Sequence, residues 1–173
     1  MDIKNIINLG SKNHIYKLLN MKNTKISRYH LEVIGEFDKE KHEEFLKENV
    51  YDWGDFDTKL FFRLCPFATT EGCNIDSNLR PHPCNLYLCR EVISSCGENY
   101  KEFSKERRDY FSYCNYFSDS LKYTLMDNNV DLLNDPFEAI EIIEQTDIPN
   151  FSFKTLPPIL FNNAPYNNDI VAG

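Results

Sequence analysis

Apolar side chains recur at helical spacing in several parts of the chain, and this pattern predicts a mainly helical fold. Residues 3–20 carry isoleucine and leucine close to helical spacing, but Gly10 and Ser11 interrupt the series, so we expect one interrupted helix or two short ones. Residues 38–50 are charged on most faces, and Asp38 suits the cap position before a surface helix.

The clearest helical pattern runs from about residue 99 to residue 126. Its apolar face carries side chains at heptad spacing, namely Phe103, Tyr110, Cys114, Phe117 and Leu121. A further helix is predicted to begin after Asp135, because Pro136 suits the first helical position and Glu138 completes a capping box.

Three shorter stretches have weaker patterns. Residues 26–34 alternate loosely, which is compatible with a strand or with the start of a helix. Residues 51–56 read as a turn anchored by Trp53. Residues 59–64 form a short apolar run, a strand or a helical turn, that leads directly into Cys65.

These patterns predict one domain, residues 1–173, in the mainly α class. Its length allows a real core, and 13 Phe and 10 Tyr supply large apolar side chains for it. We expect the helices to wrap around an irregular cysteine-rich loop at residues 65–96. From residue 149 the chain is rich in Pro and Asn, which predicts an extended arm, residues 149–173, packed on the body.

The loop at residues 65–96 contains five of the six cysteines and three of the eight prolines. Proline lacks a backbone donor and restricts the residue before it, so long regular elements are excluded here. Backbone hydrogen bonding alone would therefore not hold this loop. Thiolates gathered on a metal are the arrangement that we expect to hold it in place.

We expect four cysteines, Cys65, Cys73, Cys84 and Cys89, to bind the metal; the alternative is that they are free thiols that pack as small apolar groups. No spacing in the chain is Cys-x-x-Cys, which disfavours a common zinc module and a thioredoxin-like redox pair. Four thiolates from one loop suit an iron–sulfur cluster, with 4Fe–4S favoured, and zinc is the alternative.

Three further residues are second-rank ligand candidates. Cys96 precedes Gly97 at an expected helix end, and Cys114 lies on the apolar face of the long helix, where core packing is favoured. His82 lies between two prolines near Cys84 and could replace a cysteine as a ligand, although a surface or supporting role is the more common one.

The net charge narrows the classes of partner, and the first residues bear on the expected location of the protein. A net charge of −8 without a basic run argues against nucleic acid and against anionic membrane surfaces, but it is compatible with a protein or peptide partner. The start of the chain has no apolar signal segment, so we expect a cytoplasmic location. In that reducing compartment clustered cysteines bind metal or catalyse reactions more often than they form disulfides.

Three motifs in the loop occur in a fixed order: Cys65-Pro66-Phe67, Gly72-Cys73-x-Ile75, and Arg80-Pro81-x-x-Cys84 followed by Tyr87. This order resembles the second half of the YkgJ-like bacterial cysteine-cluster family, a zinc- or iron-chelating domain. Some relatives of that family are fused to, or resemble, a flagellin lysine N-methylase. The resemblance implies Cys65, Cys73 and Cys84 as ligands, with Arg80 and Pro81 shaping the turn.

The chain departs from the family pattern in two places. The earlier Cys-x-x-Cys-Cys-like group has no counterpart, because residues 1–64 contain no cysteine, and Cys89 stands where the family usually continues with apolar residues or proline. Either Cys89, Cys96 or Cys114 replaces the missing ligands, or the site is reduced or lost. Proximity in the sequence favours Cys89 as the fourth ligand.

Three functions follow as expectations. The first is a metal-binding protein whose iron–sulfur centre has a structural, redox or electron-transfer role. The second, implied by the methylase relatives, is an enzyme that modifies a protein or peptide, or its accessory subunit, although the chain carries no S-adenosylmethionine motif. The third is an interaction module without metal.

Overall fold

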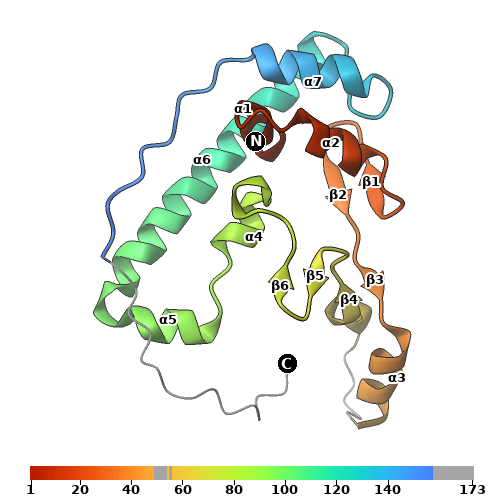
Figure 1. Ribbon diagram of the computed structural model, residues 1–173, viewed down its shortest axis with the longest axis vertical. Helices are drawn as coiled ribbons and strands as arrows, with labels where there is room; N and C mark the ends of the chain where they lie inside the picture. The colour runs from red at the N-terminus through yellow and green to blue at the C-terminus, as the bar shows by residue number, and fades with distance from the viewer. Residues whose placement is uncertain (49–53, 55, 158–173) are drawn as a thin grey trace.

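Helices form most of the molecule, as the hydrophobic pattern predicts. The computed structural model describes residues 1–48, 54 and 56–157 (Figure 1). The α-helices are α1 (Asp2–Asn8), α2 (Lys12–Leu19), α3 (Lys39–Glu48), α4 (His82–Leu86), α5 (Arg90–Cys96), α6 (Tyr100–Asp127) and α7 (Pro136–Gln145). Short 3-10 turns occur at η1 (Thr58–Phe62), η2 (Ser77–Leu79) and η3 (Gly97–Asn99).

Strands occur as short antiparallel pairs. The pairs are β1 (Thr24–Ile26) with β2 (Leu31–Val33), β3 (Glu36–Phe37) with β4 (Arg63–Leu64), and β5 (Ala68–Thr69) with β6 (Gly72–Cys73). Residues 26–34 thus hold the turn and second strand of a hairpin. The apolar run before Cys65 is a 3-10 turn followed by a strand, so both interpretations of that run are partly correct.

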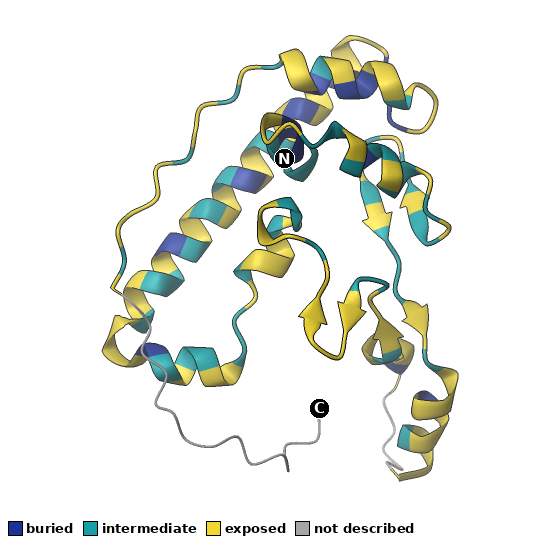
Figure 2. Cartoon of the chain, in the orientation of Figure 1, coloured by how far each residue is buried: buried dark blue, intermediate teal, exposed yellow. Residues whose placement is uncertain are grey.

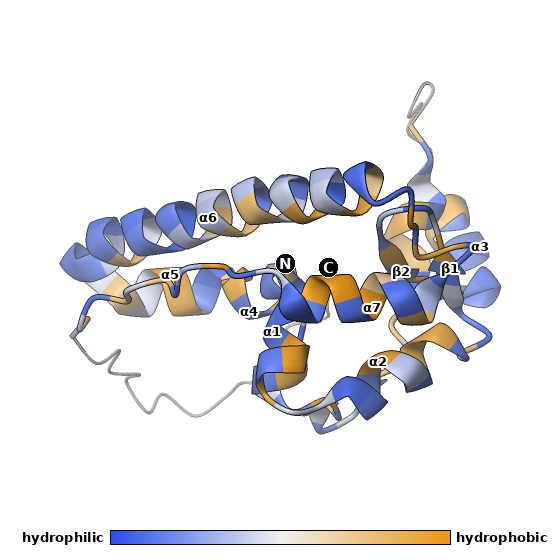
Figure 3. Cartoon of the chain, turned by 90° about the horizontal axis from the view of Figure 1, so that it is seen from above, coloured by the Kyte–Doolittle hydropathy of each residue, from blue (hydrophilic) through white to orange (hydrophobic). Residues whose placement is uncertain are grey.

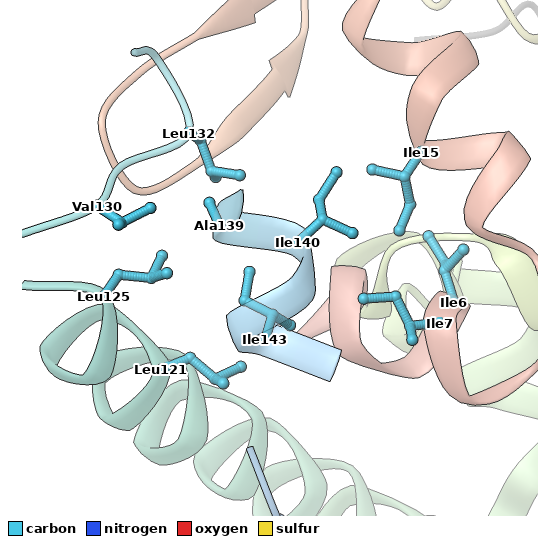
Figure 4. Packing of buried hydrophobic residues seen from close by; sticks show 10 residues of the cluster. All are labelled: Ile6, Ile7, Ile15, Leu121, Leu125, Val130, Leu132, Ala139, Ile140 and Ile143. Carbon is cyan, nitrogen blue, oxygen red and sulfur yellow. The ribbon is translucent and has the colours of Figure 1, made fainter. Parts of the chain in front are cut away.

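The hydrophobic core lies where the C-terminal half of α6 meets α7 and the two N-terminal helices (Figure 4). Its buried members are Ile6, Ile7, Ile15, Leu121, Leu125, Val130, Leu132, Ala139, Ile140 and Ile143. Helical spacing accounts for the members on α1, α2, α6 and α7, because the apolar positions of each helix fall on one face, whereas Val130 and Leu132 come from the connection between α6 and α7. The core therefore joins the first 20 residues to the segment that follows Ser118.

The N-terminal pattern resolves into two helices rather than one interrupted helix. Gly10 has φ +71°, a left-handed conformation that glycine adopts without steric cost, and this ends α1 before α2 begins. Lys4 Nζ donates to the carbonyl of Glu144 at 2.7 Å, and Lys12 forms an ion pair with the Glu144 carboxylate. Both contacts hold the N-terminal helices against the end of α7.

The described part of the C-terminal arm runs back along α6, as predicted (Figure 1). The Tyr113 hydroxyl donates to the carbonyl of Pro149 at 2.6 Å, and Phe151 lies 5.0 Å from Tyr110 and 5.3 Å from Tyr113 between ring centroids. Tyr110 and Tyr113 of α6 thus pack against the arm and not against the core. Residues 158–173 of the predicted arm lie outside the described residues.

We expect this aromatic contact to weaken at alkaline pH. Burial and the neighbouring Cys114 raise the pKa of Tyr110 to about 12, whereas an unfolded tyrosine ionises near pH 10. The unfolded state then releases a proton that the folded state keeps, so the free energy of unfolding should fall between about pH 10 and 12. Tyr110→Phe should reduce this fall in urea titrations, whereas Tyr116→Phe, at an exposed position, should not.

The approach to Cys65 is built by α3 and the β3–β4 pair. Asp38 Oδ1 accepts from the backbone N–H of Lys41 at 3.0 Å, which confirms the predicted cap. The buried His42 packs between Phe37 and Phe62 and hydrogen-bonds Thr58 Oγ1 at 2.9 Å. Val50 and the predicted turn around Trp53 lie outside the described residues.

Gly35 should tolerate no side chain at the start of β3. A Cβ atom there would lie 2.9 Å from the Leu64 carbonyl oxygen and 3.1 Å from Arg63 Cβ. We expect Gly35→Ala to lower the free energy of unfolding by about 1–3 kcal/mol, because β4 must move away. Urea denaturation followed by circular dichroism measures this, with the exposed Lys25→Ala as a control. Equal free energies of unfolding for Gly35→Ala and the wild type would show that β4 can move away without cost.

Two sequence-based expectations are wrong. The helices do not wrap around the cysteine loop, because most of residues 68–78 is exposed and the core lies elsewhere (Figure 2). The loop is also not irregular throughout, since residues 90–96 form α5. In addition, α7 begins where predicted, but the Asp135 side chain makes no cap hydrogen bond; the nearby Asp131 carboxylate instead accepts from the backbone of Leu133 and Asn134.

Polar residues are spread over most of the helical surface. Figure 3 shows apolar positions concentrated on α7, while the long α6 carries polar and weakly apolar residues along most of its visible length. Within the described parts of the chain, no helix combines the length and the apolar character needed to cross a membrane.

Candidate metal centre

A small hairpin brings Cys65 and Cys73 into the same part of the molecule. The carbonyl of Cys65 accepts from the backbone N–H of Ala68 at 3.0 Å, which closes a turn around Pro66 and Phe67. Ala68 then pairs directly with Cys73 across β5 and β6. Both cysteines are exposed, so their thiols are accessible to a ligand.

Arg80 attaches the following segment to this hairpin and so brings Cys84 close to it. Its Nε donates to the Ile75 carbonyl at 2.8 Å, and its Nη2 donates to the Cys73 carbonyl at 3.3 Å. Cys84 then lies in the first turns of α4, where its N–H donates to the Pro81 carbonyl at 2.9 Å. The predicted role of Arg80 in shaping the turn is confirmed, and its partners are backbone carbonyls.

The three thiols of Cys65, Cys73 and Cys84 are near enough for their charges to interact. Burial raises the pKa of Cys84, and the thiolates of Cys65 and Cys73 raise it further, against the opposing effect of Arg80. As the side chains stand, no three Cys, His, Asp or Glu groups among the described residues are placed to hold a metal ion. Binding would therefore require the exposed thiols to turn toward one another.

The other three cysteines lie in different surroundings. Cys89 is half-buried at the N-cap of α5. Backbone hydrogen bonding at Glu91 and, second, the neighbouring Cys89 thiol lower the pKa of the Glu91 carboxyl group. Cys96 is buried at the end of α5, where Gly97 with φ +51° ends the helix. Cys114 is fully buried on α6 beside Tyr110, which agrees with the packing role favoured for it.

No disulfide joins any of the six cysteines. Cys65, Cys73 and Cys84 share one region, whereas Cys89 lies at the start of another helix, α5. The ligand role of all four stays a prediction.

His82 has a specific partner that sequence reasoning missed. Asp2 Oδ1 accepts from the His82 backbone N–H at 2.9 Å, and the His82 Nδ1 atom lies 2.9 and 3.0 Å from the two Asp2 carboxylate oxygens. Burial alone would raise the pKa of Asp2, but the hydrogen bonds from His82 outweigh it and lower that pKa. The two residues are 80 positions apart, and no local pattern signals such a contact.

The hairpin that carries Cys65 and Cys73 has little packing of its own. Each of its strands has two residues, all of them exposed (Figure 2). An isolated two-stranded hairpin is at best marginally stable in water. This hairpin is attached to the rest of the molecule on one side through the β3–β4 pair, and on the other through Arg80, Leu79, which packs against the core, and α4, where His82 contacts Asp2.

Comparisons with known proteins do not extend the motif resemblance. No family model matches the chain, and neither a curated protein nor a solved structure matches it. The resemblance to the YkgJ-like family therefore rests on the motifs between Cys65 and Tyr87 alone.

Proposed function

We propose that this chain is a metal-binding protein whose centre is built on Cys65, Cys73 and Cys84. The single observation that supports it best is the gathering of these three thiols on one exposed hairpin and the helix attached to it. Three neighbouring thiols repel one another once ionised, and a bound cation reverses that repulsion. Soft thiolate ligands select zinc or iron–sulfur centres.

The proposed role of the metal is first of all structural. Residues 68–78 contribute almost nothing to the core, and they are ordered by hydrogen bonds within the loop together with those from the Arg80 and Asn85 side chains. A metal bound by Cys65, Cys73 and Cys84 would tie the hairpin to α4, and through His82 and Asp2 to α1. In sites of this kind, the free energy of metal binding adds to the free energy of folding.

Two centres fit these donors, and they differ in the fourth ligand. An iron–sulfur cluster, with 4Fe–4S favoured, takes a fourth thiolate, for which Cys89 is the candidate from the sequence. A zinc ion accepts either a fourth thiolate or an imidazole. An iron–sulfur cluster would also allow a redox or electron-transfer role toward a protein partner, which zinc would not.

The proposal is tested by the metal and acid-labile sulfide content of protein purified without oxygen. We expect at least one metal per chain in the wild type, with loss of metal in Cys65→Ser and Cys84→Ser. Cys114→Ala is the matched control, because this thiol is fully buried on α6. A brown protein with sulfide would identify the cluster, and a colourless protein with zinc would identify the ion.

Two outcomes would replace the proposal. A folded wild type that contains no metal and takes up none under reducing conditions would point to an interaction module in which the cysteines are packing residues. Tight binding of S-adenosylmethionine in calorimetry, with no metal, would point to the enzyme that modifies a protein or peptide.

A further inference from the structure

A pocket lies between α4 and the N-terminal half of α6, and none of the six cysteines lines it. Its volume is about 290 Å³, and its lining consists of Leu86 at the end of α4 and Ser104, Arg107, Arg108 and Phe111 of α6. The four residues of α6 are spaced at i, i+3, i+4 and i+7, so they share one face of the helix. The packing of α4 against α6 brings Leu86 to that face (Figure 1).

The apolar part of the pocket is formed by two side chains from different helices. Phe111 is 46% exposed, and its ring lies 5.7 Å from the His82 ring between centroids. Leu86 is half-buried. Pockets for small organic ligands combine apolar surface of this kind with a few polar groups that fix the orientation of the ligand.

The two arginines of the pocket lack partners within the described part of the chain. Neither Arg107 nor Arg108 takes part in an ion pair there. Nε of Arg107 is also buried without a hydrogen-bond partner. A buried donor of a charged group is costly when it is unpaired, so such an atom indicates a missing acceptor. Turning the Arg107 side chain toward a bound anion would supply that acceptor and would break no ion pair.

The charges of the pocket select an anion. Both guanidinium groups are always protonated, and they are neighbours in the sequence, so an anion between them relieves their repulsion. The planar fork of arginine matches a carboxylate with two parallel hydrogen bonds. The hydroxyl of Ser104 is a further donor at the same place. A carboxylate that carries an apolar group would use both the cationic and the apolar parts of the pocket.

We propose that this pocket binds a small organic carboxylate, with Arg107 and Arg108 on the carboxylate and Leu86 and Phe111 on its apolar body. The volume is near the lower limit for ligand pockets, so the body is expected to have the size of one aromatic ring or a short aliphatic chain. This inference goes beyond the metal centre and does not depend on it, because none of the lining residues is a proposed metal ligand.

The first test titrates the full chain with benzoate and hexanoate in a calorimeter. We expect saturable binding with a dissociation constant of about 1 mM or lower. Benzamide has the same ring without the charge and should bind at least about 10-fold more weakly, because hydrogen bonds to charged groups are lost. Inorganic phosphate should also bind more weakly than benzoate, since it leaves the apolar surface uncovered.

Three results of this titration would overturn the inference. The absence of saturable binding for both acids would remove the site. Equal affinities for benzoate and benzamide would remove the role of the arginines. Phosphate that binds as tightly as benzoate, or more tightly, would show that the pocket takes an inorganic anion and not an organic carboxylate.

Variants test the fork and the charge separately. Arg107→Lys keeps the charge but loses the planar fork, so it should lower the affinity for benzoate about 10-fold, and Arg107→Gln should lower it further. The control is Arg90→Gln, which removes the same charge from an exposed arginine outside the pocket and should leave the affinity unchanged. Circular dichroism reports whether each variant folds. Equal losses in Arg90→Gln and Arg107→Gln would reduce the effect to net charge and overturn the site.

Amide chemical shifts of the wild type locate the ligand without any substitution. The ring current of benzoate should move the resonances of residues 86, 104, 107, 108 and 111, and should leave those of β5 and β6 in place. Shifts concentrated outside the pocket would overturn the inference. The measurement needs no metal, so this inference and the proposed metal centre stand or fall separately.

Discussion

Replacing Ile140 by alanine is expected to lower the free energy of unfolding by about 2–5 kcal/mol, because the substitution leaves a cavity in a packed core. Ile140 has no exposed surface and lies in α7 between α1, α2 and α6 (Figure 4). Domains of this size are stable by only about 5–15 kcal/mol, so the loss is a large fraction of the total. Urea denaturation followed by circular dichroism at 222 nm measures it.

The matched control for this change lies on the same helix. Ile142 is partly buried at the edge of the core, so Ile142→Ala loses the same atoms with less cavity and should cost clearly less. The two variants share helix propensity, so the difference between them reports packing alone. Equal costs for both would contradict the placement of the core around Ile140.

Replacing Cys84 by serine is expected to abolish tight metal binding and to release the hairpin. A hydroxyl is a poor substitute for a thiolate ligand, so the affinity should fall by more than the 10- to 100-fold typical of changes outside the ligand shell, on the order of 100-fold or more. Hydrogen exchange should then speed up in residues 66–80. Chelator competition gives the affinity, and mass spectrometry gives the exchange.

Hydrogen exchange in the hydrophobic core is the internal reference for this experiment. The core is built from α1, α2, α6, α7 and the α6–α7 connection and contains no residue of β5 or β6, so exchange in α7 should be nearly unchanged. Cys114→Ala should leave the hairpin exchange as in the wild type. Slow exchange of residues 66–80 in Cys84→Ser, equal to that of the wild type, would show that the hairpin needs no metal for its order.

The long helices could be predicted from local spacing because their stability depends on one apolar face. The pattern of Phe103, Tyr110 and Phe117 predicted α6, and Pro136 marked the start of α7. Which segments of the chain pack on each apolar face could not be predicted from this spacing. Phe151 and Phe153 of the arm pack on Tyr110 of α6, α4 and α5 also contact this helix, and α7 packs on its C-terminal half.

The strand pairs could not be read from the sequence, because short strands carry too few residues for a periodic signal. Residues 36–37 pair with residues 63–64, far away along the chain. Pairing of that kind depends on where the helices between the strands place the chain. Gly35 is a sequence feature that this strand pairing explains, because the close approach of its backbone to Leu64 requires a residue without Cβ.

The grouping of cysteines, the prolines that divide them and the helical periods are local properties. They were sufficient for the helical class, and they led to Cys65, Cys73, Cys84 and Cys89 as ligands, which stays a prediction. The folded molecule separates Cys89 into another helix and pairs His82 with Asp2. Local spacing reports on residues that share a turn or a helix face, because their geometry follows from the backbone repeat. A contact across 80 positions depends on how the helices pack, and packing is decided only when the whole core forms.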